Sequence, residues 1–343
     1  MNIDRKQLIN LLLRMDTDLR LRSLLFELHF EEFICPAMIA RKPSAGFTTG
    51  WITGERDGKP VALKDVRNGL NSVDQKFIEH VSSKGWKTGL FEFDGRSFRA
   101  MHNSENWLQA GCERANVKFK DYCSESESKV ENRVMKYLHV IDEAVLAGGF
   151  ASRAAMNCLM KAEIVSNIRD LDAVFYSEDN GLSIVEFKRK YPMRNFRPWR
   201  SGKDLEPFPL DALSDPEPFA KPRSRPGQHF GLDTKSHGKT VVDAFAAGIR
   251  YLYLVLESRM TSPDEFFGTD LQALYRKPLL FAEVTPASFR GIAETKGVHR
   301  GRDAPRRAQS GSFNSGRRLQ LTVDRADFRL FDILSPQNEV ESL

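Results

Sequence analysis

Two acidic side chains and one lysine stand at matching positions on two apolar segments of this chain. Asp172 directly precedes the apolar segment 173–176, Glu186 stands near the end of the apolar segment 182–187, and Lys188 follows Glu186 by two residues. The polar residues between the segments end in Asn-Gly, a pair that favours a β-hairpin. Because side chains alternate faces along a strand, Glu186 and Lys188 share one face, and a hairpin would bring Asp172 alongside them. Two carboxylates and one ammonium on one face suit a hard divalent cation and a water beside a phosphodiester.

The acid-x-lysine triplet is by itself a weak signal, because the chain contains seven of them. Six lie in expected helix starts, turns or polar loops, where the charges would be solvated. Only Glu186-Phe187-Lys188 ends an apolar strand and has an acid at the start of the preceding strand. The competing interpretation is a cross-strand salt bridge on an exposed sheet face, which would need no second acid. Context therefore favours a metal-dependent phosphodiesterase site.

The set Asp172, Glu186 and Lys188 resembles the motif of the PD-(D/E)xK nuclease superfamily, which includes restriction endonucleases, Holliday-junction resolvases and phage-defence nucleases. Leu171 stands where the proline of the family's name would be. The resemblance implies an α/β fold with α+β elaborations: a restriction-endonuclease-like core in which helices flank a mixed sheet. It implies Mg²⁺, or Mn²⁺ in its place, held by Asp172, Glu186, the Phe187 carbonyl and a helical glutamate. It further implies cleavage to 5′-phosphate and 3′-hydroxyl ends.

An upstream helix at about 124–146 is expected to supply the helical glutamate. Serines at its start are candidate N-caps, acids fill its first turns, and Gly148-Gly149 ends it. Glu131, beside the apolar stripe, is the predicted third metal ligand, and Glu127 lies one turn earlier as the alternative. Either side chain could instead be a solvated acid that interacts favourably with the helix dipole.

Lys188 is expected to act on the water that attacks the phosphodiester. Its ammonium could orient that water or help to deprotonate it, and could stabilise the transition state. Asp170 is a rival for the role of Asp172, but Asp172 and a core-facing Leu171 fit the strand register better. Arg169 could hold a phosphate, or it could form a salt bridge to Asp170.

A basic segment leaves directly from the predicted catalytic strand. Residues 188–203 include seven Lys or Arg and no acid, interleaved with Tyr191, Phe196 and Trp199. Such a loop can contact phosphates through its cations and stack its rings on bases, although its rings could instead pack on the protein. The predicted nucleic-acid-binding residues are Arg169, Arg189, Lys190, Arg194, Arg197, Arg200 and Lys203.

Residues 1–121 are predicted to form an N-terminal α+β unit for recognition or oligomerisation. Apolar residues at helical spacing predict helices at 4–14, 18–33 and 69–82. The second of these should end at or before Pro36. The Asp57-Gly58 and Asp94-Gly95 pairs predict strand turns.

Residues 122–343 are predicted to form the nuclease domain, with basic insertions at 188–231 and 290–318. The second insertion holds eight Lys or Arg against two acids, and we expect a mobile loop over nucleic acid. Between the insertions, a loop leads into a helix and then into a continuous apolar strand at 249–257, as a βαβ crossover requires. Further strands are predicted at 279–284, 319–323 and 328–334.

The composition is typical of a soluble globular protein: 343 residues, 41% hydrophobic and 28% charged. A formal net charge of +5 permits nucleic-acid binding without requiring it. The four cysteines form no CxxC pair and the seven histidines form no HxxxH pattern, which argues against a zinc site. No apolar run has membrane-spanning length and the start does not resemble a signal peptide, so we expect a cytoplasmic protein without a membrane partner.

The resemblance to the PD-(D/E)xK superfamily implies a Mg²⁺-dependent endonuclease that acts on double-stranded DNA, and the large N-terminal unit and long insertions favour the restriction or phage-defence (antiviral) type within it. A homodimer would allow it to cut both strands. No GxxxxGK[ST] motif occurs, so any energy-dependent function would require a partner. Two alternatives remain: a nucleic-acid-binding protein without catalysis, and a nuclease of the same fold that acts on RNA.

Overall fold

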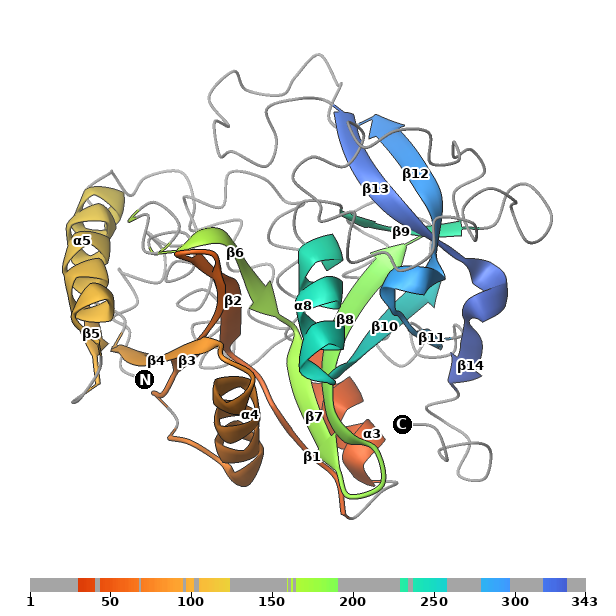
Figure 1. The fold of residues 1–343 in the computed structure, drawn as a ribbon. Helices are drawn as coiled ribbons and strands as arrows, with labels where there is room; N and C mark the ends of the chain where they lie inside the picture. The colour runs from red at the N-terminus through yellow and green to blue at the C-terminus, as the bar shows by residue number, and fades with distance from the viewer. Residues whose placement is uncertain are drawn as a thin grey trace, which may run out of the picture. The chain divides into compact units, whose positions relative to one another are not determined.

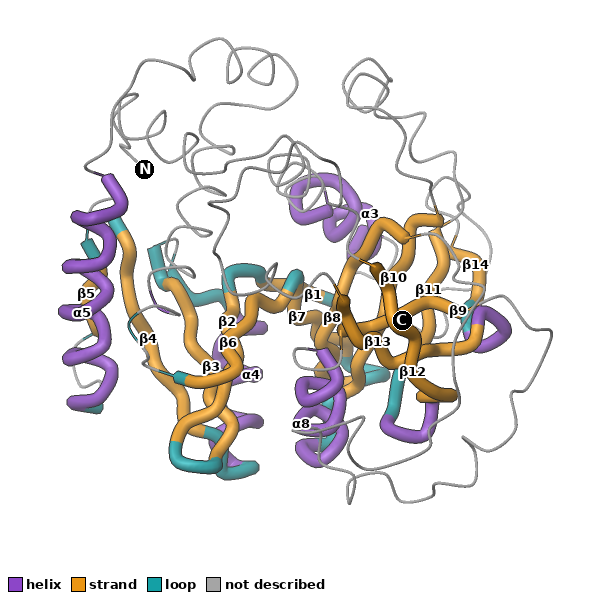
Figure 2. Tube along the Cα trace, turned by 90° about the horizontal axis from the view of Figure 1, so that it is seen from above, coloured by secondary structure: helices purple, strands orange, loops and turns teal. Residues whose placement is uncertain are grey.

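The computed structural model has a mixed α/β fold, which confirms the predicted class (Figures 1 and 2). The strands form three sheets, and helices pack against them. The structure describes residues 30–40, 44–67, 69–94, 97–101, 105–123, 159, 162, 165–190, 229–233, 237–257, 279–296 and 317–331. Within these ranges, no helix is both long enough and apolar enough to cross a membrane.

The chain divides into two compact units. The first comprises Met1–Phe187, Thr261–Leu274 and Ile333–Leu343, and the second comprises Lys188–Met260 and Tyr275–Asp332. The division into 1–121 and 122–343 that the sequence suggested stays a prediction. Its boundary falls in the last turn of helix α5 (Asn106–Cys123), and residues 124–158 lie outside the described ranges.

A five-stranded sheet forms much of the first unit. Its spatial order is β5 (Phe98–Ala100), β4 (Lys87–Phe93), β3 (Lys59–Asp65), β2 (Trp51–Arg56) and β6 (Ser166–Leu171). The β2–β3 turn has positive φ at Asp57 (54°) and Gly58 (71°), as a type I′ hairpin requires and as the Asp-Gly pair predicted. β4 runs parallel to β3, because helix α4 (Ser72–Ser83) carries the chain back between them.

Helix α4 begins with a capping box. The Asn71 side chain accepts hydrogen bonds from the backbone N–H groups of Val73 and Asp74, and the Asp74 carboxylate accepts one from the Asn71 N–H. Its buried face carries Val73, Phe77 and Val81, which lie at helical spacing. The helix predicted at 69–82 is thus confirmed, with a later start.

The predicted hairpin is also confirmed. Strands β7 (Ala173–Ser177) and β8 (Gly181–Lys190) pair antiparallel, from Ala173↔Val185 to Ser177↔Gly181. Gly181 follows the three-residue turn with a φ of 68°, a left-handed conformation that glycine adopts without steric cost. On the other side of β7 lies β1 (Gly46–Thr48), which pairs with it antiparallel.

A helical segment near the N-terminus continues past the proline that was expected to end it. A π-turn, η1 (Phe30–Ile34), leads directly into helix α3 (Cys35–Ala40). The prediction that Pro36 ends or follows this helix is therefore wrong. Pro36 is the second residue of α3, and the π-turn before it changes the backbone hydrogen-bond pattern, so the missing N–H costs little.

The second unit contains two further strand groups. In one, β11 (Leu279–Glu283) lies between β10 (Arg250–Glu257) and β14 (Arg329–Phe331), with antiparallel pairing on both sides. Helix α8 (Lys239–Ala247) precedes β10, and Gly248 ends it in a left-handed conformation. The predicted helix and apolar strand are confirmed, and Tyr251 to Leu256 of β10 are all at most 2% exposed.

The other group is a three-stranded sheet in the order β12 (Phe289–Lys296), β13 (Arg317–Asp324) and β9 (His229–Asp233). The prediction of a mobile loop over 290–318 is wrong at both ends, because β12 and β13 pair antiparallel from Phe289↔Val323 to Lys296↔Arg317. Residues 297–316 lie outside the described ranges. β9 was not predicted, since only Phe230 and Leu232 give its five residues any apolar signal.

Candidate functional site

Asp172 lies where the chain passes from one sheet into another. It follows β6 of the five-stranded sheet and precedes β7 of the hairpin, and it is 7% exposed. The backbone N–H of Phe187 donates a hydrogen bond of 2.6 Å to Asp172 Oδ2. Because Ala173 pairs with Val185, Asp172 stands opposite Glu186, as the predicted hairpin required.

The two carboxyl groups of this site are both buried. Glu186 is 1% exposed and Phe187 is 2% exposed, whereas Lys188 is half-buried. Alternation along β8 puts Glu186 and Lys188 on the same side of the strand. A salt bridge on an exposed sheet face therefore does not describe this arrangement. Burying a carboxyl group is costly in water-free surroundings unless a cation or hydrogen-bond donors compensate for the lost water.

The N-terminal helical segment packs against the strand that bears Glu186. The rings of Phe30 and Phe187 stack with centroids 4.5 Å apart. The buried Cys35 has a pKa raised well above its usual value, mainly by burial and further by the negative charges of Glu31 and Asp172. A half-buried helical carboxylate, Glu31, thus lies in the electrostatic neighbourhood of the site.

Glu31 was missed in the sequence, which pointed instead to Glu131 as the helical carboxylate. Glu131 lies outside the described residues, as does Glu127. The signal for Glu31 was modest: it follows the buried Phe30 and precedes the buried Ile34 and Cys35 on the same helical segment.

Two carboxylates are enough protein ligands for a Mg²⁺ site, but too few for a metal site that is built from protein side chains alone. Among the residues that the structure describes, no group of three or more His, Cys, Asp or Glu side chains could hold a metal ion. Mg²⁺ is commonly bound through one or two carboxylates, with waters and substrate phosphates completing its octahedron. Asp172 and Glu186 fit that pattern.

The predicted nucleic-acid-binding residues fall into three classes. Arg169, on β6 opposite Thr53, is 6% exposed, so its side chain is in the interior. Arg189 and Lys190 belong to β8, but their side chains are not described. The remaining four, and the aromatic residues among them, lie outside the described ranges: Arg194, Arg197, Arg200 and Lys203. The rival acid Asp170 is half-buried within β6, opposite Ile52, and not at the junction where Asp172 lies.

Comparison of the chain with protein-family models, with curated proteins and with solved structures finds no match. The chemistry of the site must therefore be inferred from its own residues, through their types, their burial and their hydrogen bonds.

Proposed function

We propose that this protein is a metal-dependent endonuclease with a restriction-endonuclease-like core, which hydrolyses phosphodiester bonds of double-stranded DNA. The single observation that carries the proposal is that two buried acids, Asp172 and Glu186, stand opposite each other across the β7–β8 pairing. The Phe187 N–H holds the Asp172 carboxylate against the strand that bears Glu186, and both acids are buried. A pair of buried carboxyl groups beside a lysine is the donor set that a Mg²⁺-dependent hydrolase of phosphodiesters needs.

Asp172 and Glu186 would hold the metal, together with the Phe187 carbonyl. When bound, Mg²⁺ supplies positive charge that neutralises the scissile phosphate and acidifies a water molecule. The hydrogen bond from Phe187 fixes the orientation of the Asp172 carboxylate before substrate arrives. Such preorganisation lowers the cost of reaching the transition state, because the ligand does not have to reorient.

Lys188 would act on the attacking water. It lies two residues after Glu186 on the same side of β8, and it is half-buried. There it would orient the water and balance negative charge that develops on the phosphate. Glu31 is a candidate for the helical carboxylate that the predicted scheme assigned to Glu131.

The test is cleavage of supercoiled plasmid by the purified protein in Mg²⁺ or Mn²⁺. Asp172→Ala, Glu186→Ala and Lys188→Ala should each abolish cutting while DNA binding persists. A matched control exists in Asp57-Gly58-Lys59, an acid-x-lysine triplet in the exposed β2–β3 turn. Asp57→Ala combined with Lys59→Ala should leave cutting unchanged. If the triple variant of the site cuts as fast as the parent, the proposal is wrong.

A panel of plasmid, single-stranded DNA and RNA substrates separates the alternatives. Cutting of RNA alone would indicate an RNA-directed nuclease of the same fold. DNA binding without cutting under any metal would indicate a binding protein. Mapped ends on plasmid would distinguish sequence-specific cutting, expected of a restriction-type enzyme, from indiscriminate cutting.

A further inference from the structure

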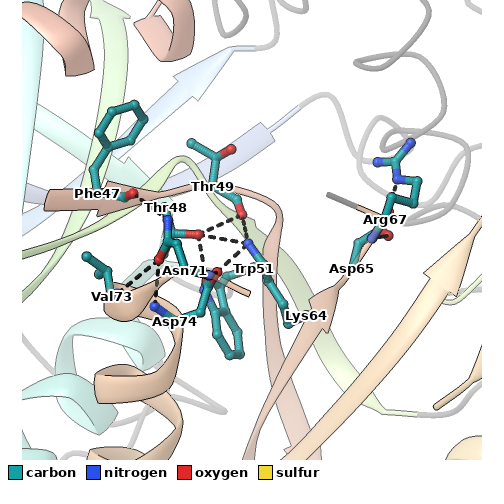
Figure 3. A network of polar contacts seen from close by, with 10 residues as sticks. All are labelled: Phe47, Thr48, Thr49, Trp51, Lys64, Asp65, Arg67, Asn71, Val73 and Asp74. Atoms are coloured by element: carbon teal, nitrogen blue, oxygen red, sulfur yellow. Dashed lines mark hydrogen bonds and ion pairs between the residues drawn. The ribbon is translucent and has the colours of Figure 1, made fainter. Parts of the chain in front are cut away.

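A buried ion pair joins Lys64 of β3 and Asp74 of α4 (Figure 3). Asp74, on α4, is 1% exposed, and its Oδ1 atom accepts hydrogen bonds from the Thr48 hydroxyl at 2.6 Å and from Trp51 Nε1 at 2.9 Å. The Lys64 ammonium lies 3.2 Å from the same oxygen. The other oxygen, Oδ2, accepts from the backbone N–H of Asn71 at 2.9 Å.

Lys64 is bound as tightly as its partner. It is 5% exposed, and its ammonium donates to the Thr48 hydroxyl at 2.8 Å and to the Thr49 carbonyl. It also lies 5.7 Å from the centroid of the Trp51 ring, within range of a cation–π interaction. Burial lowers the pKa of Lys64, and the charge of Asp74 opposes that change. Lysine and aspartate side chains are almost never fully buried unless they are paired. Asp74 is not needed for the N-terminal cap of helix α4, because the Asn71 side chain caps the helix by itself.

Asp74 and Lys64 bind residues at the point where the chain passes from one sheet into another. Thr48 ends β1, which pairs with β7 of the hairpin. Trp51 begins β2, which belongs to the five-stranded sheet. Asp74 binds both side chains, and Lys64 binds the Thr49 carbonyl between them. The pair therefore fixes the chain at the point where it changes sheets.

The segment that carries Asp172 makes the same crossing in the opposite direction, directly alongside. Its β6 end pairs with β2, with Leu171 opposite Trp51. Its β7 end pairs with β1, with Val174 opposite Thr48. The two residues bound by Asp74 are thus the strand partners of Leu171 and Val174, which lie on either side of Asp172 in the sequence.

We propose that Lys64 and Asp74 are a positioning pair for Asp172. By holding Thr48 and Trp51, they fix the paired segment 171–174 and so the direction in which the Asp172 carboxylate points. The charge of Lys64 also acts on Glu31, which shares the neighbourhood of Cys35 with Asp172. The positional claim stands on the geometry alone, whereas its consequence for metal binding rests on the proposed function.

The Phe187 amide gives a direct readout of where Asp172 lies, because that N–H donates to Asp172 Oδ2. The experiment records the ¹H–¹⁵N signal of Phe187 in protein labelled with ¹⁵N-phenylalanine, assigned by its loss in Phe187→Leu. Mn²⁺ affinity is measured on the same samples by calorimetry. The variants are Lys64→Met, which keeps the side-chain length, and Thr48→Val, which removes only the hydroxyl group.

The matched control is Lys87→Met. Lys87 pairs with Asp57 at 2.8 Å on the same sheet, but Asp57 is exposed and the pair lies away from the junction. We expect Lys64→Met and Thr48→Val to shift the Phe187 signal and to weaken Mn²⁺ binding on the order of tenfold, as loss of groups that support metal ligands commonly does. Lys87→Met should do neither.

An unchanged Phe187 signal in folded Lys64→Met and Thr48→Val would overturn the positioning claim. If Lys64→Met does not fold, Thr48→Val decides alone. If the parent protein does not bind Mn²⁺, the proposed function fails, and the Phe187 signal still decides whether Lys64 and Asp74 position Asp172. If both variants shift the signal but bind Mn²⁺ like the parent, Lys64 and Asp74 do position the Asp172 carboxylate, but this positioning does not affect metal binding.

Discussion

Phe30 stacks on Phe187 with an interplanar angle of 15°, so the N-terminal helical segment is part of the core behind the candidate site. Phe30 is fully buried, and Glu31 follows it. The helical segment that makes this contact with β8 also carries Glu31, whose charge acts with that of Asp172 on the Cys35 thiol. Phe30 thus supplies a core contact to the strand that carries Glu186.

Phe30→Ala should lower the free energy of unfolding by about 3–5 kcal/mol, the usual cost of removing a buried phenylalanine ring from a core. Urea titration followed by fluorescence or circular dichroism measures the change. The control is Phe245→Ala on α8, where the ring is 57% exposed and the change should stay within about 0.5 kcal/mol. Equal stability of Phe30→Ala and the parent would mean that the stack contributes nothing to the fold.

Glu31→Gln should weaken Mn²⁺ binding, because it removes a negative charge from the neighbourhood of Cys35 and Asp172. Calorimetric titration of Mn²⁺ into the parent and the variant measures the effect. Glu131→Gln is the discriminating comparison, since the sequence pointed to that residue as the third ligand. If Glu131→Gln weakens binding and Glu31→Gln does not, the helical carboxylate is Glu131.

Arg197→Ala combined with Arg200→Ala should lower DNA affinity and flatten its dependence on salt. Each phosphate contact contributes about 0.9 to the slope of log K against log salt, so loss of two contacts should reduce the slope by up to about 2. Fluorescence anisotropy at several salt concentrations measures it. Lys84→Ala with Arg99→Ala, at two exposed positions of the first unit, removes the same charge as a control. An unchanged slope would mean that these two arginines make no phosphate contact and that the basic segment has a structural role.

The parts of the site that the sequence predicted are those that depend on local order. Two apolar runs and an Asn-Gly turn predict how β7 and β8 pair, and the pairing places Asp172 opposite Glu186. The same holds for the Asp57-Gly58 turn and for the apolar strand β10. In each case the signal lies within one short stretch of consecutive residues.

The remaining parts depend on contacts between segments that are far apart in the chain. The charges of Glu31 and Asp172 both act on the Cys35 thiol, and no periodicity predicts the stacking of Phe30 on Phe187 in that part of the core. Asp74 belongs to one of the six acid-x-lysine triplets that were expected to be solvated. Its carboxylate is instead buried, and it contacts Thr48, Trp51 and Lys64. Pro36 was misjudged because a π-turn is not visible in a hydrophobic pattern.

A buried histidine in the second unit should make stability depend on pH. His229 begins β9 and pairs with Asp324 on β13, and it is 1% exposed. Burial lowers its pKa below the usual 6.5; the nearby carboxylates of Asp324 and Asp327 oppose this change, and Arg290 adds to it. The folded protein therefore takes up a proton on this imidazole only at a lower pH than the unfolded chain does.

Below a pH of about 6.5 the unfolded state holds the extra proton, so the free energy of unfolding should fall as the pH falls from about 7.5 to about 5.5. In His229→Gln this fall should be smaller, because the variant has no imidazole to protonate on unfolding. Urea titrations at both pH values measure the two differences. His80→Gln, at a half-buried position on α4, controls for loss of one histidine. An identical pH dependence in His229→Gln and the parent would show that His229 takes up no extra proton on unfolding in this range.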